Sequence, residues 1–586
     1  ARVDAGRILE AFGRLGPQVE PERLRAFVLE WFDVPGEADS GDSGDSGESD
    51  AAEGSRNAEN VRNAGNAEGG GETSRGLQAQ QDEDSANPPD AGAHIRALWP
   101  ELFRPASKPE GARDEKGNGG GGDGNGAGED GDGDGQRGMA ELPMHLPGSS
   151  LIPLPHPYVV PGGRFREIYY WDSFFTAQGL MVDGHAEMVH AMVRNFASMV
   201  RRFGRIPNGN RLYYRSRSQP PFFAQMVALL EAHEGPAMVR ECLPELLAEW
   251  RFWVARRSMR LENGTRVFHY GDERRAPREE SWAEDVETAR GVLAEKKETL
   301  YGHVRAACES GWDFSSRWLQ DPMRLETIRT QEILPVDLNT LMWSMQTRLA
   351  GWLREHGGDV DWGDSEWRGE SDSEAGIPDP EWMQEQADRL GEWIRRELWE
   401  EQAGMFADGE WAGAGSGFGA GVGGREQAGK RVGAQAGTQV EARMAGRTGS
   451  RHMGAFYPVA FGLAEDEQAR RAVETMEREF LRAGGLVTTL ERTGQQWDAP
   501  NGWAPLQWIG VEAAARSGRE DLAREAARRW TALNESVFAR TGKMLEKYDV
   551  EDVTKTGGGG EYPNQDGFGW TNGVFQAFRA QWGKGG

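Results

Sequence analysis

Apolar residues recur at three- and four-residue spacing through most of the chain, which is the period of amphipathic helices. The pattern predicts helices over residues 177–203, 222–257, 281–309, 324–354, 380–402, 466–483, 503–516 and 519–538. A further helix or helix pair is expected at residues 6–33. Alternation with a period of two, which is typical of strands, is scarce. The sequence therefore predicts an all-α fold, with helices joined by loops rich in Gly and Pro.

Four polar stretches interrupt this pattern, at residues 36–92, 107–140, 355–378 and 411–450. The first carries 14 acidic and 3 basic residues and the second carries 8 and 4, so the two hold more than half of the formal net charge of −27. Such Gly- and acid-rich composition is typical of low-complexity, disordered segments. Because patterned sequence resumes after each stretch, we interpret all four as insertions into a single domain spanning residues 1–586.

The overall charge and the absence of long apolar runs limit the partners. A strongly acidic chain is a poor ligand for nucleic acid or an anionic membrane surface. No apolar run reaches the roughly 20 residues of a membrane span, and no signal peptide is visible. We expect a soluble protein whose compartment stays open, because the chain starts at Ala1 without Met and looks incomplete there. The sequence does not indicate the oligomeric state. Cys242 and Cys308 could form one disulfide bond, but we favour two unpaired thiols.

The segment richest in candidate chemistry is residues 161–172, which read PGGRFREIYYWD. Its glycines let the backbone approach a ligand closely, and its arginines are directed donors to oxygen. Aromatic rings can stack on the apolar face of a sugar, and Asp172 can hydrogen-bond its hydroxyl groups. The alternative is the start of an aromatic helix with solvated charges.

Two later segments share this character. Residues 496–505 (QWDAPNGWAP) repeat the Trp-Asp pair, and residues 557–563 (GGGGEYP) place a carboxylate on a glycine-rich loop. Five shorter blocks lie between or after them: PNG at 207–209, RSQPP at 217–221, ESGWDFSSRW at 309–318, PVDLN at 335–339 and EKYDV at 546–550.

In content and order these segments resemble the signature blocks of the trehalases of glycoside hydrolase family 37. The resemblance covers most of residues 1–35, 93–106 and 145–583. It implies an (α/α)6 toroid with its site at the loop end, and inverting hydrolysis of α,α-trehalose to two glucose molecules without a metal or cofactor. Two alternatives are another α-glucoside hydrolase on the same toroid and a non-catalytic trehalose-binding protein.

Glycoside hydrolysis needs a proton donor for the leaving oxygen and a second carboxylate that activates water. The residues alone do not rank the loop carboxyls, which are Asp172, Asp313, Asp498, Glu546 and Glu561. By resemblance, Asp313 matches the general acid and Glu546 the general base, while Glu561 is a rival base assigned to substrate binding. The flanking Trp312 and Phe314 would raise the pKa of Asp313 and favour its protonated form. The alternatives are a helix N-cap for Asp313 and a surface Glu-Lys pair for Glu546.

The resemblance also implies a set of substrate contacts, namely Arg164, Trp171, Asp172, Asn208, Arg217, Ser218, Gln219, Arg278, Glu279, Glu280, Gly311 and Glu561. At Arg278-Glu279-Glu280 the chain departs from the Arg-Pro-Glu of the family, so surface ion pairing is an alternative there. In the second signature, Trp497, Asp498 and Asn501 are expected to shape the wall of the pocket. Core packing is the alternative for both tryptophans of that segment.

A calcium-loop pattern occurs at residues 130–141, which read DGDGDGQRGMAE. Arg137 stands at the eighth position, where such loops carry an apolar residue, and the Gly-rich sequence before it predicts no entering helix. Specific calcium binding is therefore not favoured, and calorimetric titration would test it. The glycine runs lack the Gly-Lys-Ser/Thr element of a phosphate loop.

Overall fold

The computed structural model describes residues 90–107, 143, 148–360, 362, 376–412 and 441–583. The helix expected at residues 6–33 and the calcium-loop pattern at residues 130–141 lie outside these ranges. The described helices and strands belong to one compact unit, formed by Pro89–Leu146 and Ser150–Gly586. Among the described helices, none is long and apolar enough to cross a membrane.

Helices of this unit pack into a closed inner ring. In ring order its members are α4 (Tyr170–Val182), α6 (Phe223–Glu234), α10 (Val336–His356), α12 (Tyr457–Ala460), α14 (Ala504–Arg516) and α16 (Gly569–Trp582). Each contacts the next, and α16 packs extensively against α4, which closes the ring. Helix α4 is buried over most of its circumference, as expected for a helix surrounded by others.

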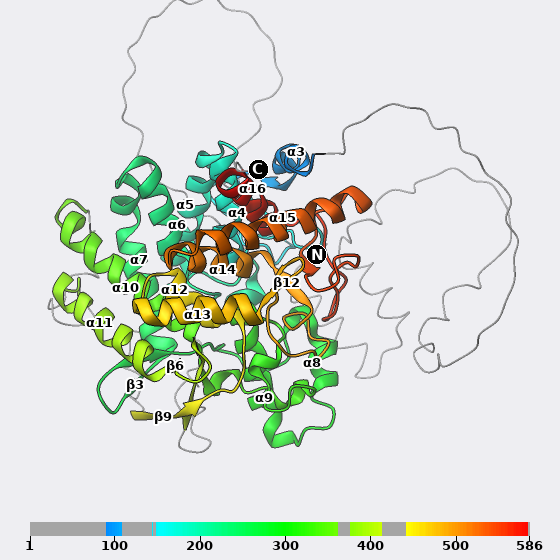
Figure 1. Ribbon diagram of the computed structural model, residues 1–586. Helices are drawn as coiled ribbons and strands as arrows, with labels where there is room; N and C mark the ends of the chain where they lie inside the picture. Colours follow the sequence, from blue (N-terminus) through cyan, green and yellow to red (C-terminus); the bar gives the residue numbers. More distant parts are fainter. Residues whose placement is uncertain are drawn as a thin grey trace, which may run out of the picture. The chain divides into compact units, whose positions relative to one another are not determined.

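A second set of helices covers the ring from outside. These are α5 (Ala186–Phe203), α7 (Ala237–Arg256), α11 (Pro380–Glu397), α13 (Asp466–Glu479), α15 (Glu520–Thr541) and α3 (Ala91–Leu102). Figure 1 shows α13, α14 and α15 running side by side. Helix α13 buries only a stripe that includes Ala472, Val473 and Met476, which is the pattern of a helix with one face in water. The arrangement is the (α/α)6 toroid that the sequence predicts.

The connections of this ring differ in length. Short turns such as Asp183–His185 and Gly235–Pro236 join an inner helix to its antiparallel outer neighbour, so the inner helices all run in the same direction. Long connections lead from each outer helix to the next inner helix, at residues 103–169, 204–222, 257–335, 398–456, 480–503 and 542–568. These long segments therefore meet at the end of the ring where the inner helices begin.

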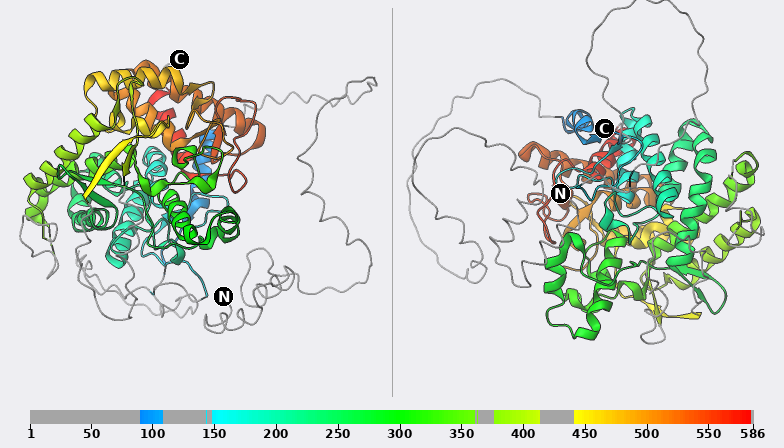
Figure 2. Two further views of the ribbon diagram at one scale, coloured as in Figure 1. Left: turned by 90° about the horizontal axis from the view of Figure 1, so that it is seen from below. Right: turned by 180° about the vertical axis from the view of Figure 1, so that it is seen from behind.

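The long connections contain most of the remaining helices. In the first half of the ring are η1 (Leu212–Tyr214), η2 (Glu279–Ser281), α8 (Trp282–Thr288), α9 (Ala294–Ser310), η3 (Ser316–Trp318), η4 (Leu325–Thr327) and η5 (Thr330–Glu332). Two more 3-10 helices are η6 (Gly357–Asp359), which follows α10, and η7 (Met453–Phe456), which precedes α12. In the view from behind in Figure 2, the green segment with α8 and α9 projects from the helical ring.

The connections also form small sheets that the sequence pattern did not predict. A five-stranded sheet has the order β4 (Arg266–Phe268), β3 (Ser258–Leu261), β9 (Glu441–Arg447), β8 (Gly409–Ala412), β5 (Ile333–Leu334). Four antiparallel pairs join β1 (Phe103–Arg104) to β2 (Tyr158–Val159), β6 (Trp399–Glu400) to β7 (Met405–Phe406), β10 (Leu481–Arg482) to β11 (Gly485–Leu486), and β12 (Asn501–Trp503) to β13 (Lys547–Asp549). All of these strands except β9 have two to four residues, which is too short for alternation to be visible in the sequence.

Several expected boundaries differ from the observed ones. The ranges 177–203 and 222–257 each divide into two helices, because Gly184 and Gly235 adopt positive φ at the turns. In the range 324–354 the helix begins only at Val336, since the preceding residues form 3-10 turns and strand β5. Regular structure also enters the predicted insertions: helix α3 begins inside the range 36–92 and strand β9 inside the range 411–450.

Candidate active site

A cavity of about 890 Å³ lies at the end of the ring where the long connections meet. The structure brings most of the predicted site residues to its wall: Arg164, Trp171, Asp172, Asn208, Arg217, Gln219, Arg278, Glu280, Gly311, Asp313, Trp497, Glu546 and Glu561. They come from five of the long connections and the first turn of α4, so folding assembles positions that are far apart in the sequence.

Asp313 reaches the cavity from the loop between α9 and η3. Ser315, and not Asp313, caps η3, since its side chain accepts a hydrogen bond from the Arg317 amide. Removal from bulk water raises the pKa of Asp313 to about 7. The positive charge of Arg278 opposes this shift, whereas the negative charge of Glu561 adds to it. Asp313 is therefore a carboxyl group that holds a proton near neutrality.

The second signature segment fixes the loop that carries Asp313. Gln496 donates from its side-chain amide to the Asp313 carbonyl oxygen, and the Trp497 amide donates to the Phe314 carbonyl oxygen at 3.1 Å. Asp498 accepts from the Ser315 hydroxyl at 2.8 Å and from the amide and hydroxyl of the following Ser at 2.9 and 2.8 Å.

Asp498 itself is fully buried and does not line the cavity, so it anchors the loop and is not a candidate acid. Asn501 also lies behind the wall, where its side-chain amide donates to the carbonyl oxygens of Gln496 and Gly558.

Glu546 faces the same cavity from the start of β13. Its Oε1 accepts a hydrogen bond from the Tyr562 hydroxyl at 2.8 Å, and its Oε2 lies 3.6 Å from the Lys547 ammonium. Burial raises the pKa of Glu546 above its ordinary value, and Lys547 and Tyr562 oppose that rise. Glu546 and Lys547 are almost completely buried, so they do not form the surface pair considered as an alternative.

A third carboxyl group, Asp172, enters the cavity from the first turn of α4. It is buried, which raises its pKa well above the usual range. The negative charges of Glu546 and Asp313 raise it further, while its own backbone amide lowers it. The cavity thus holds three mutually interacting carboxyl groups in different surroundings, which is a pattern typical of acid–base sites.

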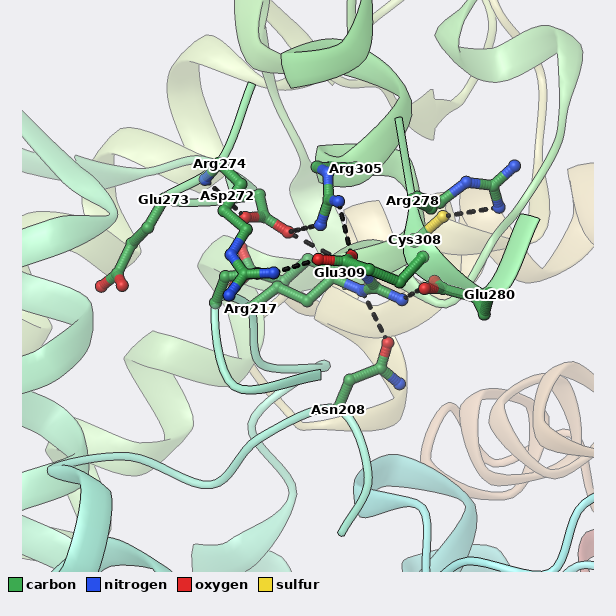
Figure 3. Close-up of polar contacts among 12 residues, drawn as sticks. Asn208, Arg217, Asp272, Glu273, Arg274, Arg278, Glu280, Arg305, Cys308 and Glu309 are labelled. Carbon is green, nitrogen blue, oxygen red and sulfur yellow. Dashed lines mark hydrogen bonds and ion pairs between the residues drawn. The ribbon is translucent and has the colours of Figure 1, made fainter. Parts of the chain in front are cut away.

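Arg217 is a buried cation that lines the cavity, and Figure 3 shows its polar contacts. Its Nε donates to Asn208 Oδ1 at 2.8 Å, and its Nη2 donates to Glu280 Oε1 at 2.5 Å. Asp272 lies 3.8 Å from Nη1 and 3.4 Å from Arg305, so it joins two buried arginines behind the wall. These contacts fix the direction of the guanidinium group before a ligand arrives.

Arg278 is equally buried, so surface ion pairing is excluded for it. Its guanidinium group donates to Asp285 through Nε at 3.0 Å and Nη2 at 2.6 Å, and Nη2 also donates to Glu561 Oε1 at 2.8 Å. The guanidinium carbon lies 5.1 Å from the centre of the Phe314 ring, beside Asp313. Arg278 thus links the glycine-rich loop of Glu561 to the loop of the candidate acid.

Two of the predicted substrate contacts do not line the cavity. The Ser218 hydroxyl donates to the Ile206 carbonyl oxygen at 2.7 Å, and its amide donates to the buried Glu309 at 2.7 Å, so Ser218 supports the loop from behind. Glu279 turns away and pairs with Arg274 and, at 2.7 Å, with Arg305. For Glu279 the alternative of ion pairing therefore describes the structure better than substrate contact.

Aromatic rings form the floor of the cavity. Trp497 stacks on Trp503 with centroids 3.9 Å apart, and on its other side it lies 5.4 Å from Trp312. Trp171 packs against Trp497 with centroids 5.8 Å apart. Both tryptophans of the second signature, Trp497 and Trp503, are buried against other rings and also line the cavity. They therefore contribute both to the pocket wall and to core packing.

Sequence reasoning missed three functional candidates that stand directly beside predicted ones. Tyr562 follows Glu561, Lys547 follows Glu546, and Gln496 precedes Trp497. Adjacency in the signature blocks was the available signal, but only the fold shows that these three side chains reach the candidate carboxyl groups or the backbone that carries them.

Comparison with known proteins agrees with this geometry. The Trehalase family model matches residues 137–582. A periplasmic trehalase of Xanthomonas axonopodis pv. citri (strain 306) is 42% identical over 441 residues, which is 73% of this chain and 68% of that protein. A periplasmic trehalase of Escherichia coli O139:H28 is 40% identical over 440 residues, 72% of this chain and 68% of that protein. The structure of neutral trehalase Nth1 from Saccharomyces cerevisiae superposes with a TM-score of 0.55 at 24% identity, over 72% of this chain and 73% of that one, which supports the toroidal fold.

Proposed function

Because this chain belongs to the trehalase family, we propose that it hydrolyses α,α-trehalose to two glucose molecules, with Asp313 as general acid and Glu546 as general base. The observation that carries these two roles is the meeting of both carboxyl groups in one cavity, each with different charged neighbours. An acid must hold its proton at the working pH, and a base must have lost its own.

Asp313 supplies the proton to the glycosidic oxygen. Its pKa of about 7 leaves it largely protonated in mildly acidic solution, so the leaving glucose departs as a neutral alcohol. After the transfer, the nearby guanidinium group of Arg278 stabilises the carboxylate that remains.

Glu546 is the carboxylate that activates water. The Tyr562 hydroxyl donates to its Oε1 atom at 2.8 Å and so holds the carboxylate in one orientation. A general base needs a fixed orientation toward the proton that it accepts. Attack by that water on the anomeric carbon, opposite the departing oxygen, inverts the configuration in a single displacement.

The remaining wall binds and orients the sugar. Asn208, Arg217 and Glu280 form a hydrogen-bonded group with fixed geometry, and Arg164 lies over the Tyr562 ring at 4.7 Å. Glucose rings have apolar faces, which suit the tryptophan floor. These groups form specific hydrogen bonds to hydroxyl groups without a metal or cofactor.

The direct test is hydrolysis by the purified protein, with trehalose and maltose compared at equal concentration. We expect release of glucose from trehalose and little from maltose, whose second glucose presents different hydroxyl groups to the arginines. Preference for maltose would favour another α-glucoside hydrolase, and trehalose binding without turnover would favour a binding protein.

A further inference from the structure

Lys547 is a buried cation that the assignment of acid and base does not use. Its side chain has no exposed surface, although a lysine ammonium is strongly hydrated in water. Burying such a charge costs several kcal/mol unless opposite charge and hydrogen bonds compensate. A methionine would fill a similar volume at no such cost, so packing alone does not account for a lysine at this position.

The ammonium group of Lys547 lies between the elements that carry the two catalytic carboxyl groups. It is 3.6 Å from Glu546 Oε2 and donates a hydrogen bond to Gln496 Oε1 at 2.8 Å. The same Gln496 side chain donates through Nε2 to the Asp313 carbonyl oxygen. A continuous chain of polar contacts therefore runs from the general base, through Lys547 and Gln496, to the main chain of the general acid.

From this arrangement, we propose that Lys547 is a positioning residue for both carboxyl groups, holding positive charge beside Glu546 Oε2 and fixing the Asp313 main chain through Gln496. The inference rests on the proposed roles of Asp313 and Glu546. It assigns Lys547 no contact with substrate.

The first part of this role is electrostatic. The groups that act on Glu546 are Lys547 at the start of β13, Tyr562 on the glycine-rich loop, the Gln565 backbone and Asp172 on α4. Burial and the negative charge of Asp172 favour the neutral form of Glu546, and the ammonium group of Lys547 is the strongest influence that favours the ionised form.

The second part is geometric. Gln496 is held on its main-chain side, where its carbonyl oxygen accepts from Trp503 Nε1 at 3.0 Å and Asn501 Nδ2 at 3.1 Å. Its side-chain amide is oriented by Lys547, because an amide whose oxygen accepts from an ammonium must direct its NH₂ group the other way. That NH₂ group meets the Asp313 carbonyl oxygen, so the charge on Lys547 also sets the position of the acid.

The test is the pH profile of kcat/KM for trehalose with Lys547→Met in the full chain. We expect the acidic limb to move to higher pH by at least about 1 unit, because Glu546 loses its neighbouring cation. The acidic and basic limbs of the pH profile then lie closer together. We expect kcat to fall while KM changes little. Lys543→Met, which removes an exposed lysine shortly before Glu546, is the matched control and should leave the profile unchanged.

A purely structural lysine would give a different result, with activity reduced by the same factor at every pH and an acidic limb in its original place. That result overturns the inference while the proposed function stands. If the wild-type protein does not hydrolyse trehalose, both the inference about Lys547 and the proposed function are contradicted.

Gln496→Met keeps the test decisive if Lys547→Met does not fold. This variant breaks the connection to Asp313 but leaves Lys547 beside Glu546. We expect kcat to fall at least about tenfold, since loss of correct orientation is costly in catalysis, with the acidic limb unmoved. An unchanged kcat would contradict the positioning role.

Discussion

Single residues differ in this cavity mainly through their immediate neighbours. Removal from bulk water raises the pKa of Asp313 to about 7, while Arg278 opposes this rise and Glu561 adds to it. Glu546 is equally buried but has the ammonium group of Lys547 and the hydroxyl group of Tyr562 beside it, and both stabilise its ionised form. Two carboxyl groups of similar intrinsic acidity are thereby suited to opposite tasks.

Asp313→Asn tests the role of the acid. Asparagine keeps the size of the side chain but has no proton to give, so we expect kcat for trehalose to fall by at least about a thousandfold. An unfolding curve followed by circular dichroism should match that of the wild type and so show that the variant folds normally. Asp388→Asn, on the exposed face of α11, is the matched control and should retain full activity. Activity near the wild-type level in Asp313→Asn would place the acid elsewhere.

The pH dependence of kcat/KM follows from the same surroundings. The base works only when ionised, so activity is lost as pH falls through the pKa of Glu546, which burial raises above its ordinary value. The acid works only when protonated, so activity is lost as pH rises through about 7, the pKa of Asp313. We expect a bell-shaped profile with its maximum at mildly acidic pH. A profile that stays flat up to pH 9 would contradict the assignment of Asp313.

At this scale the sequence predicted the carboxyl groups and most wall residues, because they stand in signature blocks that are long enough to recognise. Ser218 and Glu279 belong to the same blocks, but the structure does not place them at the cavity wall. The direction of a side chain within a loop depends on tertiary contacts, here with Glu309 for Ser218 and with Arg305 for Glu279. Neighbours in sequence do not reveal such contacts.

Elements contribute by placing these residues precisely, and the end of α9 is an example. Gly311 ends the helix with φ of +77°, and a Cβ atom at this position would lie 2.7 Å from an indole carbon of Trp171. The close approach lets the floor of the cavity meet the loop of Asp313. Only glycine combines that backbone conformation with that contact.

Gly311→Ala should therefore displace Trp171 and harm function. We expect a rise in KM, a fall in kcat and a loss of stability of about 2–4 kcal/mol, from the left-handed backbone together with overpacking. Gly542→Ala is a close control, because Gly542 also ends a helix with positive φ (+68°) but has no atom within 4 Å of the added Cβ. Equal effects of the two substitutions on activity would show that the Trp171 contact is unimportant.

Helices were predictable from the sequence because their apolar stripes are long, whereas the sheets were not. Strands β5 and β8 contribute two and four residues to a sheet whose strands come from two different connections. Such pairing is non-local, and the local sequence carries no period of two. The same limit applies to the range 324–335, whose apolar spacing resembles a helix although Ile333 and Leu334 pair with a strand.

For the molecule as a whole, a buried network joins the ring to the site. Arg317 donates to Asp337 at the start of α10 and to Asp408 before β8, each through two nitrogen atoms, at 2.7–2.9 Å. Its guanidinium group also lies 4.7 Å from the Trp312 ring and 4.3 Å from the Trp318 ring. One cation thus connects an inner helix, the five-stranded sheet and the loop that carries Asp313.

Arg317→Met would leave two buried carboxylates without their cation. We expect the free energy of unfolding to fall by about 3–5 kcal/mol, as is typical when one partner of a buried ion pair is removed. Arg324→Met, at an exposed pair with Glu326, should leave stability unchanged within error. Chemical denaturation of the three proteins measures the difference, and equal stability of Arg317→Met and wild type would show that the network is dispensable.

The stereochemistry of the products tests the central claim most directly. Trehalose has two α-linked anomeric carbons, so a single displacement by water inverts one centre and leaves the other unchanged. Proton NMR of a fresh digest, recorded before mutarotation, should show β-glucose and α-glucose in equal amounts. Release of α-glucose alone would show retention at both centres and would contradict the assignment of Glu546 as a base that activates water.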